Sequence, residues 1–134
     1  MKLAIIGSET CFRPKQVKEI LFKIKQNFGK GCTIITGGNK SGIEYEVKKC
    51  CMLFELEYQE FNPSFTGWNV YSALSRDYYT KRKHFSHYSH RYDMMLRLGI
   101  DRIIIGEQLD AKDWKMYESI KKKCEKKQIK VIMI

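Results

Sequence analysis

Short apolar runs alternate with longer amphipathic stretches along the chain. Lys2–Ile6 is an apolar run that ends at Gly7-Ser8. After Pro14, apolar residues recur three or four positions apart with lysines between them: Val17, Ile20, Leu21, Ile24 and Phe28. A short apolar run is typical of a buried strand, and a period of three to four residues is typical of an amphipathic helix. The pattern therefore predicts a strand over 2–6 and a helix from Pro14 that Gly29 and Gly31 close.

The same alternation continues through the middle of the chain. Cys32–Thr36 is rich in β-branched residues and predicts a second strand. A helix is predicted from about Gly42 to Phe54, and its buried side is formed by Ile43, Val47, Cys50, Cys51 and Phe54. Beyond it, apolar residues alternate with glutamates, which predicts a third strand ending near Phe61. The apolar positions of this strand are Phe54, Leu56 and Tyr58.

The last third of the chain repeats the pattern. A helix is predicted from about Ser89 to Leu98, and a fourth strand over Arg102–Ile105. Asp110 is a suitable cap for a last helix, with Asp113 near its first turn. The inner stripe of that helix is predicted to hold Trp114, Tyr117 and Cys124, and its outer face Lys121, Lys122 and Lys123. Lys130–Ile134 is the predicted terminal strand.

Strands that alternate with helices predict an α/β fold with a mostly parallel sheet of about five strands and helices on both faces. The 134 residues fit a single domain over 1–134. A segment at about 65–90 follows neither period and is rich in aromatic and basic residues, including Tyr78, Tyr79 and Lys81-Arg82-Lys83. We interpret this segment as an insert.

Glycines mark the ends of three predicted strands, at Gly7-Ser8, Gly37-Gly38 and Gly106. In parallel α/β folds, ligands lie beyond the carboxyl ends of the strands. Glycines let bare N–H groups approach a ligand closely, and the helix that opens after Gly42 adds the positive end of its dipole. This arrangement is typical of sites that bind phosphate or another anion. The alternative is a tight strand-to-helix turn with no ligand.

The candidate ligand-binding residues surround these glycine turns. Glu44 is a candidate acceptor for ribose hydroxyls, or else an acid that complements the helix dipole. Arg91 is a candidate phosphate clamp, or else one partner of a surface salt bridge. Ser41 is a candidate anion donor or a helix cap. The full set is Gly7, Ser8, Glu9, Arg13, Thr36, Gly37, Gly38, Asn39, Ser41, Gly42, Glu44, Arg91 and Gly106. No catalytic residue is assigned.

The composition of the chain indicates which kind of partner and which cellular compartment to expect. The net charge of +10 favours a polyanionic partner, although much of the excess lies on helix faces that water must solvate in any case. No apolar run approaches the ~20 residues of a membrane helix, and the start of the chain has no pattern of a signal peptide. Five cysteines without a Cys-x-x-Cys pair predict reduced, mostly buried thiols in a cytoplasm.

Several short motifs resemble the SLOG superfamily, and more narrowly its YspA-like branch of Rossmann-type nucleotide-binding domains. They are Ile6-Gly7-Ser8, Thr36-Gly37-Gly38 with Gly42-Ile43-Glu44, Phe61-Asn62-Pro63 with Trp68, and Arg91-Tyr92-Asp93-Met94-Met95. The resemblance covers most of the chain up to Gly106. It implies a Rossmann-like three-layer sandwich that binds a nucleotide or ADP-ribose-like ligand. Through this superfamily the chain is also distantly similar to LOG-like and DprA-like proteins.

The chain departs from that family pattern at informative positions. Glu9 replaces the expected arginine, and Tyr92 replaces an asparagine. Phosphoribohydrolases of the superfamily carry Pro-Gly-Gly-x-Gly-Thr-x-x-Glu after the fourth strand, where this chain has Gly106-Glu107-Gln108-Leu109-Asp110. The resemblance therefore favours ligand binding. Hydrolysis of a nucleotide N-glycosidic bond, with Arg91 and either Glu44 or Glu107 in the active roles, is the enzymatic alternative.

The insert leaves further alternatives open. Its aromatic and basic residues are suited to a lid, to a contact in a homo-oligomer, or to stacking on single-stranded nucleic acid. His84, His87 and His90 fall three residues apart, a spacing that allows a shared metal on a helix. Because no acidic or cysteine partner lies at a suitable spacing, the sequence predicts neither a metal site nor a cofactor.

Overall fold

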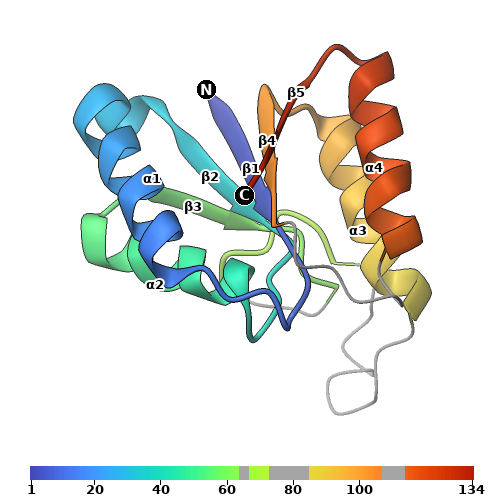
Figure 1. The fold of residues 1–134 in the computed structure, drawn as a ribbon, viewed down its shortest axis with the longest axis horizontal. Helices are drawn as coiled ribbons and strands as arrows, with labels where there is room; N and C mark the ends of the chain where they lie inside the picture. The colour runs from blue at the N-terminus through green and yellow to red at the C-terminus, as the bar shows by residue number, and fades with distance from the viewer. Residues whose placement is uncertain (64–66, 73–84, 107–113) are drawn as a thin grey trace.

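The computed structural model describes residues 1–63, 67–72, 85–106 and 114–134, and the side chains of 85–88 are not described. In these ranges the chain forms a five-stranded, all-parallel sheet in the order β3-β2-β1-β4-β5, with helices on both faces (Figure 1). The strands are β1 (Lys2–Ile6), β2 (Thr33–Thr36), β3 (Glu57–Glu60), β4 (Arg102–Ile105) and β5 (Lys130–Met133). The helices are α1 (Pro14–Phe28), η1 (Gly29–Gly31), α2 (Ile43–Phe54), α3 (Phe85–Leu98) and α4 (Trp114–Lys126). The predicted Rossmann-like α/β sandwich is confirmed.

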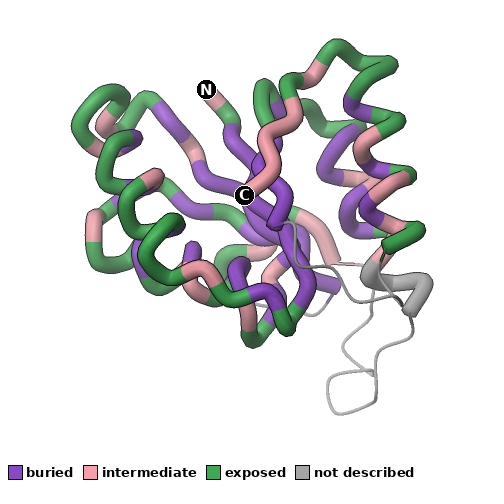
Figure 2. Tube along the Cα trace, in the orientation of Figure 1, coloured by how far each residue is buried: buried purple, intermediate pink, exposed green. Residues whose placement is uncertain are grey.

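The two faces of the sheet carry separate cores because successive strand residues point to opposite sides. In β1, Leu3 and Ile5 pack with α1 and α2, whereas Ala4 and Ile6 pack with α3 and α4. Figure 1 shows these two helix pairs on opposite sides of the sheet, and Figure 2 shows the buried residues gathering along the strands and at the turns that follow β1 and β2. The sheet therefore forms the middle layer of three.

Two predictions were wrong, the assignment of Phe54 to the third strand and the position of Trp114 in the inner stripe of the last helix. Phe54 is the last residue of α2 and not part of the third strand, because Glu55, which caps the helix with a left-handed φ of 55°, separates the two elements. Phe28 is 47% exposed and Trp114 is 53% exposed. Each of these two aromatic residues is the terminal residue of its helix, where the helix extends past the edge of the core. The buried stripe of α4 is Tyr117, Ile120 and Cys124.

The prediction for the cysteines is confirmed, whereas the predictions for the Asp110 cap and for most of the insert fall on residues outside the described ranges. All five cysteines are free and buried, as predicted, and burial raises the pKa of Cys51 to about 12. The Asp110 cap with Asp113, and most of the predicted insert, lie outside the described ranges. In the described part of the chain, no helix is both long enough and apolar enough to cross a membrane.

Candidate ligand site at the glycine loop

The glycine-marked strand ends lie at one edge of the sheet. β1 pairs in parallel with β2 on one side and with β4 on the other, so Gly7, Gly37 and Gly106 leave the sheet at the same edge. The first two strands are therefore neighbours in the sheet. The chain proceeds from β1 outward to β3 and then returns to β4 on the other side of β1, which is the topology that creates ligand crevices in open α/β sheets.

The turns after β1 and β2 are in direct contact. Gly42, at the N-terminus of α2, has a φ of +77°, and a Cβ built there would lie 2.5 Å from the carbonyl oxygen of Ser8. A residue with a side chain would be strained in this backbone conformation and would clash with the neighbouring turn. The Ser41 hydroxyl adds a long hydrogen bond of 3.4 Å to the Glu9 carbonyl. Gly42 is therefore required for the close approach of the two turns.

Glu44 contacts the glycine loop, which we define as residues 37–42, from the buried side of the loop. It lies in the first turn of α2, and its side chain is 0% exposed. One carboxylate oxygen accepts a hydrogen bond from the Gly37 backbone amide. The other accepts hydrogen bonds from Asn39 Nδ2 at 2.6 Å and from the Tyr92 hydroxyl at 2.8 Å. Glu44 thus accepts the hydrogen bond of the Gly37 amide, so this amide is not available to a bound anion.

Arg91 reaches the same loop from α3, on the other face of the sheet. Its Nη1 donates to the Gly37 carbonyl at 2.6 Å, and its Nη2 donates to Asn39 Oδ1 and to the Tyr92 hydroxyl, both at 2.8 Å. Nη2 also lies 4.0 Å from a Glu44 oxygen. The side chain is 2% exposed, so the alternative of a surface salt bridge is wrong. We call Glu44, Arg91, Asn39 and Tyr92 the buried cluster.

Burial shifts the pKa values of the ionisable groups in the buried cluster. Burial raises the pKa of Glu44, against the opposing effects of Arg91, the Tyr92 hydroxyl and the amides of Gly37 and Gly7. Burial alone would lower the pKa of Arg91, but Tyr92, Glu44 and Tyr117 together hold it above its usual range. Burial also raises the pKa of the Tyr92 and Tyr117 phenols well above their usual range. Arg91 therefore stays a cation, and both tyrosines stay protonated.

The other predicted residues fall into two groups. Ser8 and Thr36 are buried within the protein's own hydrogen bonds, Ser8 with Thr10 at 2.9 Å and Thr36 with the Tyr58 hydroxyl at 2.8 Å. Gly106 packs against Cys11, whose sulfur would lie 2.5 Å from an added Cβ. Around the glycine loop, the accessible residues are Glu9, Gly38, Lys40, Ser41 and Gly42. Arg13 is half-buried at the start of α1 and donates to the Phe12 carbonyl at 3.1 Å.

Two residues of this site were not among the predicted ones. Tyr92, which departs from a family motif, was not assigned to the site, although its hydroxyl bridges Glu44 and Arg91. Asn62, which follows β3, donates a long hydrogen bond of 3.4 Å to the Gly38 carbonyl and lies under a loop residue with a φ of +73°. An asparagine just beyond the carboxyl end of a strand next to β2 was the available signal for this second contact.

A second cluster, which we call the edge cluster, surrounds Glu60 at the end of β3. The Glu60 side chain accepts a hydrogen bond from the Tyr58 hydroxyl at 2.9 Å and forms an ion pair with Lys48 at 3.1 Å. The Lys48 ammonium lies 4.2 Å from the centre of the Trp68 ring. Thr36 joins the cluster through Tyr58. The carboxyl edge of the sheet therefore carries two buried glutamates, Glu44 in the buried cluster and Glu60 in the edge cluster.

The described residues offer no cluster of three or more histidine, cysteine or carboxylate groups that could hold a metal ion. His90 is exposed, its ring centre 5.6 Å from that of Tyr71, while His84 lies outside the described ranges and the His87 side chain is not described. The basic run Lys81-Arg82-Lys83 lies outside them as well.

No protein-family model matches this chain, and neither a curated protein nor a solved structure matches it. The likeness to the SLOG superfamily therefore stays an expectation from the motifs quoted above.

Proposed function

We propose that the chain binds the anionic part of a nucleotide or ADP-ribose-like ligand on the outer side of the glycine loop. The observation that carries this proposal is the buried Glu44–Arg91 pair clamped on Gly37. Removing two charges from water is costly, and a buried ion pair is often no more stabilising than packed apolar residues. Such a pair beneath a glycine loop, at the carboxyl edge of a parallel sheet, supports a functional reason for its presence.

In this proposal the buried cluster supports the loop and does not contact the ligand. Glu44 fixes the Gly37 amide, and Arg91 fixes the Gly37 carbonyl, so the peptide groups on both sides of this residue are held. A loop held in advance loses less conformational freedom when a ligand binds. The roles first expected for Glu44 and Arg91, contact with ribose and with phosphate, thus pass to the residues on the accessible side of the loop.

That accessible side has the chemistry to bind an anion. Lys40 and Ser41 are exposed, and Gly38 and Gly42 are partly exposed. The loop leads directly into the N-terminus of α2, whose first amides and dipole favour negative charge. The Gly37 and Gly38 amides already donate to Glu44 and Thr36, so a phosphate on this side would contact Lys40, the Ser41 hydroxyl and the first amides of α2.

Thermal unfolding with a ligand panel tests the proposal. Nucleoside monophosphates, ADP-ribose and cyclic dinucleotides are added to the full chain, and one class is expected to raise Tm. A ligand at a hundredfold excess over its Kd stabilises the folded state by about 2.7 kcal/mol. Lys40→Glu is expected to weaken that ligand by about tenfold, which is ~1.4 kcal/mol. Lys30→Glu is the matched control, because exposed Lys30 precedes β2 at the opposite edge of the sheet.

The proposal fails if no member of the panel raises Tm at millimolar concentration, or if the two lysine variants weaken binding equally. The same mixtures, analysed for free base, test N-glycosidic hydrolysis. The geometry favours binding over hydrolysis because both oxygens of Glu44 already accept hydrogen bonds inside the protein. Glu107, the other carboxylate considered for that role, lies outside the described ranges.

A further inference from the structure

A groove with an apolar floor lies on the outer surface of α1 and α2. It has a volume of about 390 Å³ and is lined by Lys15, Lys18, Glu19, Phe22 and Phe54. The rings of Phe22 and Phe54 meet edge to face with their centres 5.9 Å apart, and Phe22 is 49% exposed. We call this surface the α1–α2 groove. It shares no residue with the glycine loop or with the buried cluster.

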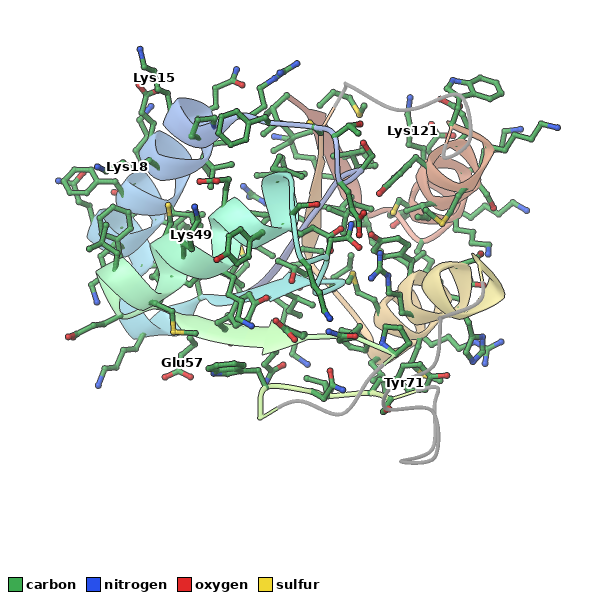
Figure 3. The ribbon with its side chains drawn as sticks, turned by 90° about the horizontal axis from the view of Figure 1, so that it is seen from below. Lys15, Lys18, Lys49, Glu57, Tyr71 and Lys121 are labelled. Carbon is green, nitrogen blue, oxygen red and sulfur yellow. The ribbon has the colours of Figure 1, made fainter. Side chains whose placement is uncertain are left out.

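Two lysines and one glutamate, Glu19, supply the charges of the α1–α2 groove. In the described ranges no ion pair involves Lys15 or Lys18, whereas Lys49 on α2 is paired with Glu46. Both groove lysines are exposed, and Figure 3 shows them projecting from α1 away from the body of the protein. The first turn of α1 contains no acidic residue. The groove thus combines an apolar floor with a charged lining that is net positive, two lysines beside one glutamate.

We propose that the α1–α2 groove binds a short amphipathic helix of a partner protein, with apolar anchors on one face and acidic residues beside them. The phenyl rings supply a floor for the anchors, and Lys15 and Lys18 pair with the acids. From Lys15 to Phe22 the surface of α1 spans roughly 10 Å, which is about two helical turns. This length accommodates two anchors one turn apart.

Charge and geometry favour this occupant over two others. A second copy of the chain would bring a molecule of net charge +10 against the same lysines, and like charges would repel. Single-stranded nucleic acid needs open aromatic faces on which bases stack. Here the two rings meet edge to face and line one shared groove, so they are better suited to aliphatic anchors.

Fluorescence anisotropy on the full chain tests the proposal. The probe is a labelled peptide of about four helical turns, with leucines at positions i, i+3, i+4 and i+7 and glutamates on the flanks. Micromolar binding is expected. Phe22→Ser and Lys18→Glu are each expected to weaken it by at least about fivefold, because the first removes part of the apolar floor and the second reverses a charge that pairs with the peptide's glutamates. Trp114→Ser and Lys122→Glu, at exposed positions of α4, are the matched controls and are expected to leave Kd unchanged.

Two further measurements make the result decisive. A peptide of the same composition, with its leucines spread around the helix, is expected to bind at least about tenfold more weakly. Chemical-shift changes in labelled protein are expected to centre on α1 and the end of α2, and this mapping stands even if one variant fails to fold. Equal binding of both peptides, or shift changes centred elsewhere, would overturn the proposal. So would tighter binding of a labelled oligothymidine that the same two substitutions weaken.

Discussion

Glu44 and Glu60 are both buried at the carboxyl edge of the sheet, with exposed fractions of 0% and 1%, but their cations differ in their access to water. Glu44 shares its enclosure with Arg91, whose side chain is 2% exposed. Glu60 pairs with Lys48, whose side chain is 27% exposed. In the buried cluster both charged side chains are therefore shielded from solvent, whereas in the edge cluster solvent reaches the lysine. Solvent weakens the second pair and stabilises its lysine if the pair breaks.

The two cations also make different contacts, because Arg91 binds the backbone of the glycine loop and Lys48 contacts only side chains in the described structure. The planar Arg91 guanidinium binds a carbonyl, an amide oxygen and a phenol at fixed angles, which positions the glycine loop. Lys48 is a compact charge between Glu60 and the Trp68 ring. The backbone of Glu60 in turn pairs with Trp68 at 3.0 Å and with Val70 at 2.9 Å. The comparison indicates a rigid support beneath the proposed ligand loop and an adaptable closure at the edge of the sheet.

The largest expected effect comes from removing the cation of the buried pair. Arg91→Met leaves the Glu44 carboxylate buried without a cation, and we expect a loss of about 3–5 kcal/mol in the free energy of unfolding at neutral pH. Lys48→Met is the matched substitution at the edge cluster, with an expected loss of about 1 kcal/mol, because water reaches that pair. Urea denaturation of the two variants beside the wild type measures both values.

Equal losses in these two variants would contradict the distinction between a dry and a solvent-accessible pair. The loss in Arg91→Met is also expected to shrink at acidic pH, since protonation of Glu44 removes the uncompensated charge. A loss that does not change with pH would show that packing, and not charge, is the main contribution of Arg91.

The second prediction concerns the charge of Glu44 itself. Glu44→Gln places an amide donor against the donors of Gly37, Asn39 or Tyr92, and we expect a loss of about 1–3 kcal/mol at low pH. Burial raises the pKa of Glu44, so the folded state binds this proton more tightly than the unfolded chain. The stability linked to this proton is fully present below the unfolded pKa of about 4.3 and is lost as the pH rises through the folded pKa.

The free-energy difference between wild type and Glu44→Gln is therefore expected to shrink as the pH rises across that window. Chemical denaturation at a series of pH values measures it. Glu46→Gln, in the same turn of α2, is the control for the loss of a partly buried carboxylate that is paired with the exposed Lys49. A difference that grows with pH would mean that the hydrogen bonds to Glu44 outweigh its burial.

Sequence periodicity predicted the frame of the fold better than the polar network inside it. The bounds of β1, β4 and α1 followed from apolar spacing, and the parallel topology placed the glycine turns at one edge. Periodicity counts apolar residues, however, and so assigns a charged residue such as Arg91 to the surface. Its partners Gly37 and Asn39 lie 54 and 52 positions away, and no local pattern encodes contacts over that separation.

The third prediction compares the tyrosine of each cluster. Tyr92→Phe removes the hydroxyl that donates to Glu44 and accepts from Arg91, and we expect a loss of about 1.5–2 kcal/mol because both partners are charged and buried. Tyr58→Phe removes the hydroxyl between Thr36 and Glu60, with an expected loss of about 1 kcal/mol, since Lys48 still pairs with Glu60. Thermal and urea unfolding measure the two losses. A larger loss in Tyr58→Phe would reverse the order of the clusters.

The smallest expected effect is at the solvent side of the edge cluster. Trp68 is 45% exposed and faces the Lys48 ammonium, so Trp68→Leu removes a cation–π contact at an exposed site, with an expected loss of about 0.5–1 kcal/mol. In the Lys48→Met background the same substitution should cost less, because the cation is already absent, and this double-mutant cycle isolates the contact. If Trp68→Leu costs the same in both backgrounds, Trp68 closes the edge by packing alone. If it costs several kcal/mol, the edge cluster is as rigid as the buried one, and the contrast between the two glutamates does not hold.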